Sequence, residues 1–224
     1  MRRRAILPLL AATLLAACAG GPPAPDWQAT AHDALTAYRS AYLKGETRVA
    51  EAEFARARQA LARTGRADLV ARAELTRCAV RTASLEAGTE SRNAGDERGE
   101  SCPGFAALAI DADEAAHAYA DFLAGRATDP ARLPAQYRDL AAGEAALAGI
   151  ADPLPRLVAA GVLLRSGRLS PTGIDLAVDT AAGEGWRRPL LAWLGVQAEL
   201  ATARGDDEGA ARARRRAALV AGER

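Results

Sequence analysis

Apolar residues recur at helical spacing through almost the whole chain beyond residue 25, and this periodicity constrains the fold more than any other feature. Roughly a quarter of the 224 residues are alanine, and only 4% are aromatic. Alanine has the highest helix propensity, and its small side chain lets helices approach closely. The sequence lacks the sustained alternation of apolar and polar residues that a half-buried strand would need. It therefore predicts an all-α protein.

In the first half of the chain, stripes of apolar residues that end close to glycines predict four helices. We expect these helices to run from Trp27 to near Gly45, from Val49 to near Gly65, from Asp68 to Leu85, and from Phe105 to Leu123 just before Gly125. Glycine is common after the last turn of a helix because it adopts the left-handed backbone conformation without strain.

Helix starts are clearer in the second half of the chain. Asp152-Pro153 and Ser170-Pro171 each pair an N-capping residue with a proline, which is favoured at the first helical position. The other predicted boundaries are the openers Pro134 and Pro189 and the terminators Gly167 and Gly205. We expect about eight to ten helices joined by short turns, packed as antiparallel hairpins in a repeat-like array or an irregular bundle.

Two segments resemble the second helix of a tetratricopeptide repeat. The first contains Gly45, Ala50, Phe54 and Ala57 at the family's spacing, and the second contains Gly205, Asp206, Ala210 and Ala217. In the second segment, Arg214 stands where the family has a large aromatic residue. Gly45 and Gly65 are 20 residues apart, and the family's period of about 34 residues does not persist. The resemblance implies helical hairpins, whereas peptide binding would follow from it only by analogy.

The N-terminus has the layout of a secretory signal. Three arginines follow Met1, and a short apolar run from Ala5 to Leu15 comes next. This run is too short to cross a bilayer, which takes about 20 apolar residues. It ends in Leu15-Ala16-Ala17-Cys18, which resembles the lipobox of bacterial lipoproteins.

The lipobox resemblance implies cleavage before Cys18 and attachment of membrane lipid, with acyl chains such as palmitate, to that cysteine. Residues 1–17 would be the signal peptide, 18–25 a lipidated Gly/Pro-rich tether, and 26–224 a single helical domain. Ala19 follows the cysteine in place of the Asp that retains enterobacterial lipoproteins in the inner membrane. The expected location is therefore the outer membrane, facing the periplasm. The alternative is an ordinary signal peptide and a released protein.

Two cysteines remain if Cys18 carries lipid. Cys78 and Cys102 form an even pair in an exported chain, so a disulfide is the expected state. A metal pair or a nucleophile are the competing interpretations, but no histidine with ligand spacing lies nearby in the sequence.

Several polar groups are candidate functional residues. Asp113, His117 and Asp121 share one helical face, which we interpret as solvated, and His32 is also expected to be exposed. Trp186, Arg187 and Arg188 have the composition of an interface, although Trp186 could instead fill the core at a helix start. The last group is a C-terminal arginine cluster: Arg212, Arg214, Arg215 and Arg216. It could contact an anionic surface or, alternatively, stabilise the C-terminal end of a helix dipole.

The charge balance excludes a nucleic-acid partner. Loss of Arg2, Arg3 and Arg4 with the signal lowers the 29 basic residues to 26, against 28 acidic ones. No motif predicts catalytic residues, a metal site or a cofactor. We therefore expect a membrane-anchored envelope lipoprotein whose helical domain binds or scaffolds a protein partner. A cell-wall enzyme and a carrier of lipids or small molecules remain the alternatives.

Overall fold

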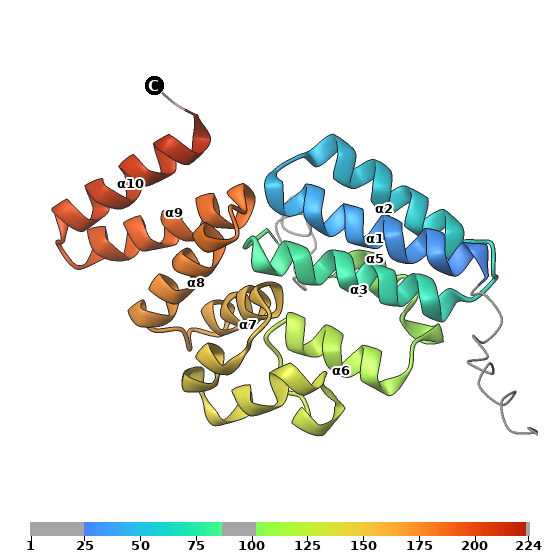
Figure 1. Cartoon of the computed structure of the whole chain (residues 1–224). Helices are drawn as coiled ribbons and strands as arrows, with labels where there is room; N and C mark the ends of the chain where they lie inside the picture. The colour runs from blue at the N-terminus through green and yellow to red at the C-terminus, as the bar shows by residue number, and fades with distance from the viewer. Residues whose placement is uncertain (1–24, 87–101, 223–224) are drawn as a thin grey trace, which may run out of the picture.

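The computed structural model describes residues 25–86 and 102–222, and within these ranges the chain forms helices and no strands. Figure 1 shows α1, α2 and α3 side by side, with α7 between them and the α8–α10 hairpins. The α-helices are α1 (Asp26–Lys44), α2 (Thr47–Ala62), α3 (Ala67–Ala83), α5 (Pro103–Ala106), α6 (Glu114–Leu123), α7 (Pro153–Arg165), α8 (Pro171–Gly183), α9 (Arg187–Ala203) and α10 (Asp207–Ala221). The 3-10 helices are η1 (Ala109–Asp111), η2 (Pro130–Arg132), η3 (Ala135–Ala142) and η4 (Glu144–Gly149). The predicted all-α fold of helical hairpins is confirmed.

The α1–α2 hairpin is held by aromatic residues in its seam. Gly45 ends α1 with a φ of 87°, a left-handed conformation that strains most other residues, and the chain reverses there. Tyr38 is completely buried, and its ring centroid lies 5.1 Å from that of Phe54 in α2 and 5.7 Å from that of Tyr42. Such tilted aromatic pairs stabilise beyond their buried area.

The two N-capping residues predicted in the second half of the chain, Asp152 and Ser170, each cap the start of a helix. The Asp152 carboxylate accepts a hydrogen bond from the Leu154 backbone nitrogen at 3.1 Å, at the start of α7. The Ser170 hydroxyl accepts one from the Gly173 nitrogen at 3.3 Å, at the start of α8. Each satisfies a backbone donor that the first turn of a helix leaves unpaired. Pro189 is the third residue of α9, not its opener.

The helix predicted from Phe105 to Leu123 is wrong. The structure breaks it into α5, η1 and α6, because the Asp113 side chain accepts a hydrogen bond from the Ala116 nitrogen and starts a new helix. The apolar spacing continues across the break, so periodicity alone conceals it. Pro134 likewise precedes the 3-10 helix η3 instead of an α-helix. Gly143, with a φ of 131°, ends η3 after eight residues.

Two apolar clusters meet at α3. The larger one gathers around α7, α8 and α9, and the smaller one around α1 and α2. Gly161 of α7 lies so close to α3 that a Cβ atom there would be 2.4 Å from the carbonyl oxygen of Thr82. The indole nitrogen of Trp193 donates to the Ala83 carbonyl oxygen at 3.0 Å and ties α9 to the same helix.

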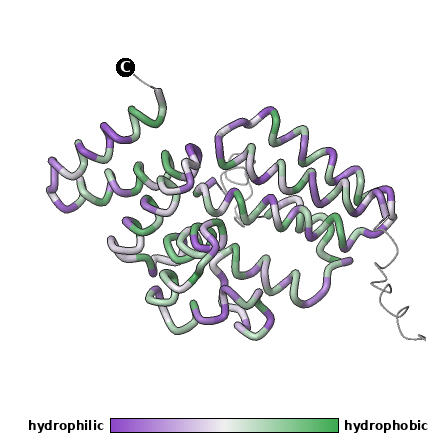
Figure 2. Tube along the Cα trace, in the orientation of Figure 1, coloured by the Kyte–Doolittle hydropathy of each residue, from purple (hydrophilic) through white to green (hydrophobic). Residues whose placement is uncertain are grey.

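Hydropathy differs along the array. Figure 2 shows hydrophilic residues recurring along α2 and α10, whereas apolar residues gather around α7. Within residues 25–86 and 102–222, no helix is both long and apolar enough to cross a bilayer.

Candidate binding site

The segment from Trp186 to Arg188 forms the start of α9, where the sequence predicted either an interface or a core contact. Trp186 is half-buried and packs against both apolar clusters. Its packing supports the core interpretation, because the indole ring bridges the two halves of the domain. Whether the segment also contacts a partner stays a prediction.

Arg188 connects α9 to α1. Its side chain is only 18% exposed, its guanidinium carbon lies 4.3 Å from the centroid of the Tyr42 ring, and its Nε donates to the Tyr42 carbonyl oxygen at 2.9 Å. Its Nη1 pairs with Glu86 at 2.9 Å, and the Tyr42 hydroxyl also donates to Glu86. Burial raises the pKa of Tyr42 above its usual range, and the bond to Glu86 raises it further. The hydroxyl therefore remains a donor, and the network holds the first and last hairpins together.

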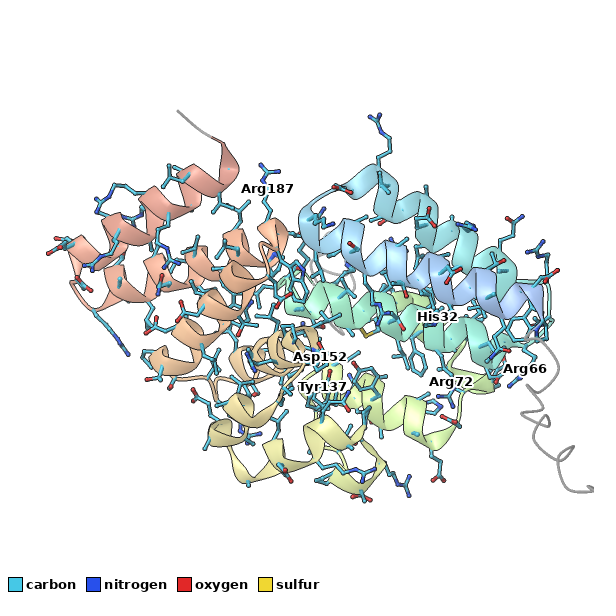
Figure 3. All side chains as sticks on the ribbon, viewed as in Figure 1. His32, Arg66, Arg72, Tyr137, Asp152 and Arg187 are labelled. Carbon is cyan, nitrogen blue, oxygen red and sulfur yellow. A yellow bond between two sulfur atoms is a disulfide. The ribbon has the colours of Figure 1, made fainter. Side chains whose placement is uncertain are left out.

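Arg187 connects α9 to the end of α10. Figure 3 shows its side chain at the start of α9. Its Nε donates to the Val220 carbonyl oxygen and its Nη2 to the Ala221 carbonyl oxygen, each at 3.0 Å. A cation at the last carbonyls of a helix satisfies unpaired acceptors and opposes the helix dipole.

The arginine cluster of α10 does not act on the helix dipole. α10 continues to Ala221 and has no basic residue in its last turn, so the predicted dipole role is wrong for Arg212, Arg214, Arg215 and Arg216. They lie in the middle of the helix, which runs from Asp207 to Ala221. Arg187, which lies far away in the sequence, supplies the cation instead.

A polar groove of about 300 Å³ runs between α8, α9 and α10. Its lining includes Arg204, Arg212 and Arg216, together with two carboxylates. Both carboxylates are already engaged: Asp206 accepts from the Gly209 nitrogen at 2.8 Å, and Asp175 accepts from Gln197 Nε2 at 2.7 Å. α10 packs mainly against α9, and the groove beside it is partly open to solvent. The groove can therefore accept an anionic group.

Arg204 and Arg216 are the two groove arginines that have no ion pair within residues 25–86 and 102–222. Arg212, in contrast, pairs with Glu208 at 3.4 Å. The sequence analysis identified Arg216 in the cluster but missed Arg204. The signal that could have found it is the predicted terminator Gly205, because Arg204 directly precedes this glycine in the turn that joins α9 to α10.

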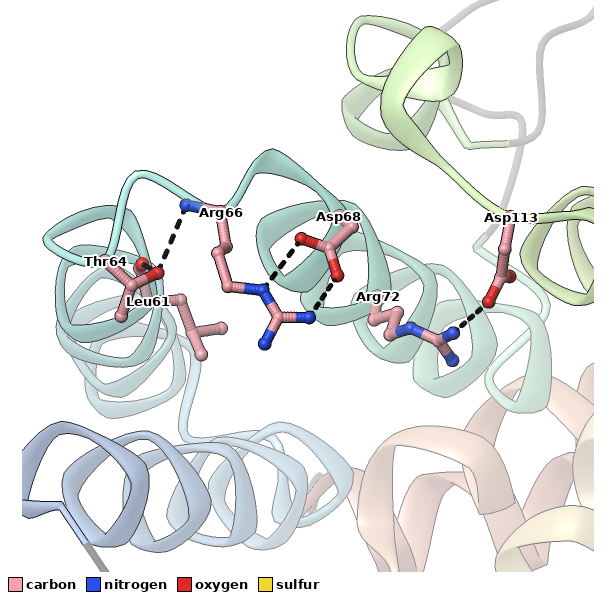
Figure 4. A network of polar contacts seen from close by, with 6 residues as sticks. All are labelled: Leu61, Thr64, Arg66, Asp68, Arg72 and Asp113. Atoms are coloured by element: carbon pink, nitrogen blue, oxygen red, sulfur yellow. Dashed lines mark hydrogen bonds and ion pairs between the residues drawn. The ribbon is translucent and has the colours of Figure 1, made fainter.

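On the predicted polar face around His117, the acidic side chains form ion pairs with nearby arginines. His117 and His32 are both exposed, as expected. Asp113 pairs with Arg72 of α3, and Figure 4 shows this contact beside the pair between Arg66 and Asp68. The hydrogen bonds from Arg66 lower the pKa of Asp68. Among the described residues, no group of three or more His, Cys, Asp or Glu side chains is placed to hold a metal ion.

The disulfide predicted between Cys78 and Cys102 is present in the structure. Both residues are buried, and their Cα atoms are 5.4 Å apart. The bridge fastens the start of α5 to α3, so neither sulfur is free to act as a metal ligand or a nucleophile. The predicted lipobox cysteine, Cys18, and the tether that follows it lie outside the described residues.

Comparisons of the chain with protein-family models, with curated proteins and with solved structures found no match. Its function must therefore be inferred from its own residues.

Proposed function

We propose that this chain is an outer-membrane lipoprotein, anchored through acylated Cys18, whose helical domain binds an acidic segment of another envelope protein. The N-terminal signal and the Leu15-Ala16-Ala17-Cys18 motif support the anchor. Two or more acyl chains hold a protein stably, whereas a single chain gives only marginal binding. The Cys78–Cys102 disulfide supports export, because disulfides persist mainly in oxidising compartments.

The groove between α8, α9 and α10 is the observation that carries the binding role. Arg204 and Arg216 line it without an ion pair to any described residue, so their charges are available to a partner. Guanidinium groups bind carboxylates through charge-assisted, often bidentate hydrogen bonds. The groove lies at the surface between three helices, where Asp or Glu side chains of a partner segment can reach these arginines.

The anchor is tested by metabolic labelling in the native host. The wild-type chain should incorporate radiolabelled fatty acid, and Cys18→Ala should abolish the label. A wild-type chain that takes up no label would refute the anchor while leaving the groove unaffected.

The groove is tested with a short fluorescent glutamate-rich peptide and a lysine-rich peptide of the same length. The glutamate-rich peptide should bind, and its affinity should fall as the ionic strength increases. Arg204→Gln combined with Arg216→Gln should weaken binding by about tenfold or more, equivalent to at least one charge-assisted bond. Arg48→Gln combined with Arg63→Gln, two exposed arginines at the ends of α2, provides the control. Equal loss in both double variants would contradict a specific role for the groove.

A further inference from the structure

A second cavity, with different chemistry, lies between the C-terminal ends of α6 and α7 and the turns η2 and η3. Its volume is about 280 Å³, close to the lower end of the range for small-molecule pockets. It lies on elements distinct from α9 and α10, and it shares no lining residue with the groove described above. Nothing in the proposed protein-binding role uses it.

The floor of this pocket is apolar and aromatic. Its buried lining residues are Phe122, Leu133, Tyr137, Leu140, Val162 and Leu163. The ring centroids of Phe122 and Tyr137 are 4.8 Å apart, and the Tyr119 ring, which does not line the pocket, stacks on Tyr137 at 5.8 Å. Burial raises the pKa of Tyr137 well above its usual range, and Figure 3 labels this buried side chain close to the exposed Asp152. The floor therefore offers an uncharged, rigid surface to an apolar group.

The rim of the pocket is polar and positively charged. Arg126, Thr128, Ser166 and Arg168 line it, and no Asp or Glu is among the lining residues. Arg126 pairs with Asp121 at 2.6 Å. Arg168 is exposed, has no ion pair with a described residue, and reaches only the Leu140 carbonyl oxygen at 3.5 Å. Its positive charge therefore lies beside an apolar cavity whose lining contains no carboxylate.

We propose that this pocket binds a small amphipathic carboxylate, with its hydrocarbon part against Phe122 and Tyr137 and its carboxylate on Arg168. Burial of the hydrocarbon supplies affinity in proportion to the apolar area removed from water. The guanidinium supplies selectivity, because it binds an anionic head and repels a cationic one. A simple alcohol would fill the floor but leave the charge at the rim unpaired.

Calorimetric titration of the purified full-length protein with octanoate, octanol and octylammonium tests this proposal, with protein-free blanks in the same medium. Octanoate should bind saturably with a Kd below about 1 mM and a negative heat-capacity change. Octanol and octylammonium should bind at least about tenfold more weakly. The absence of saturable octanoate binding, or equal binding of octylammonium or octanol, would overturn the proposal.

Two matched pairs of variants locate the ligand. Arg168→Gln should weaken octanoate binding about tenfold without changing octanol binding, whereas Arg48→Gln, at an exposed arginine of α2 that lines neither cavity, should change neither. Ala141→Phe should block the pocket, and Ala142→Phe should not, because the neighbouring alanine is equally exposed on η3 but does not line the cavity. Since both alanines are on the surface, the fold should tolerate either change. Unaltered octanoate binding by Arg168→Gln or by Ala141→Phe would contradict the assigned site.

Discussion

The α1–α2 hairpin and the α9–α10 hairpin are built from the same kind of element but are filled differently. The first closes on Tyr38, Tyr42 and Phe54, which are almost completely buried. In α10 of the second, only Ala210 and Ala213 are buried. Large aromatic side chains fill the contact between α1 and α2. The small alanines of α10 leave a groove beside α9 and α10, and arginines line that groove. The comparison teaches that α1 and α2 meet through large buried rings, whereas α10, whose buried residues are two alanines, leaves its arginines beside the seam with α9.

The largest expected effect comes from the residue pair that distinguishes the two hairpins. Phe54→Ala should reduce the free energy of unfolding by about 3–5 kcal/mol, because it leaves a cavity against Tyr38. Arg214→Ala, at the corresponding place in α10, should change it by less than about 0.5 kcal/mol, because this side chain is exposed. Denaturant titration of both variants measures the difference. Similar losses would show that the α9–α10 hairpin contributes to the core as much as the first does.

Removal of the disulfide should have the next largest effect. Cys78→Ser combined with Cys102→Ser should lower stability by about 3 kcal/mol, since the bridge closes a loop with a sequence separation of 24 residues. The loss should be concentrated where α5 meets α3, and hydrogen exchange should therefore increase there before it increases in α9 and α10. Uniform acceleration along the chain would contradict this division.

Arg188 is the link between the two hairpins, and its removal should cost less. Arg188→Gln should lower stability by about 1.5–3 kcal/mol, because it breaks the bond to Glu86 and the contact with the Tyr42 ring. A double-mutant cycle with Glu86→Gln should show a coupling of at least about 0.5 kcal/mol. Arg187→Ala, which removes only exposed bonds to the end of α10, should cost under about 1 kcal/mol and is the matched control. A coupling near zero would mean that the link is not cooperative.

The smallest expected effect is a loss of folding stability that is absent at neutral pH and begins only at alkaline pH. Burial raises the pKa of Tyr119 to about 12, and it also raises the pKa values of Tyr38, Tyr42 and Tyr137. A raised pKa in the folded state means that the unfolded chain releases its tyrosine protons first, near pH 10.

Stability should therefore be unaffected by these groups below about pH 10 and should fall above it, by up to about 1.4 kcal/mol per pH unit for each tyrosine. Tyr119→Phe should make this decline shallower. The α9–α10 hairpin contains no tyrosine, so hydrogen exchange at high pH should increase first in α1 and around η3. A decline that starts well below pH 10 would show that another group is responsible.

Several features of this molecule could be predicted from local sequence. The capping pairs at Asp152 and Ser170 start their helices, and Gly45 ends α1, because each acts within one helical turn. The disulfide followed from counting the cysteines with Cys18 set aside as the expected site of lipid attachment. The break near Asp113 was missed because the apolar spacing of an alanine-rich segment continues through it, and only the capping carboxylate marks the new start.

The sequence by itself determined the helical class, most helix boundaries and the pairing of Cys78 with Cys102, because these depend on backbone preferences and on covalent chemistry. Tertiary structure alone decided the roles of the arginines. Arg188 meets a carboxylate 102 residues away and Arg187 meets a helix end 34 residues away, so no local pattern could reveal either contact. Arg168 and Arg204 lack an ion pair with any residue of the described ranges for the same reason. Whether a surface arginine is paired depends on which distant elements the packing brings beside it, and a one-dimensional pattern does not contain that distance.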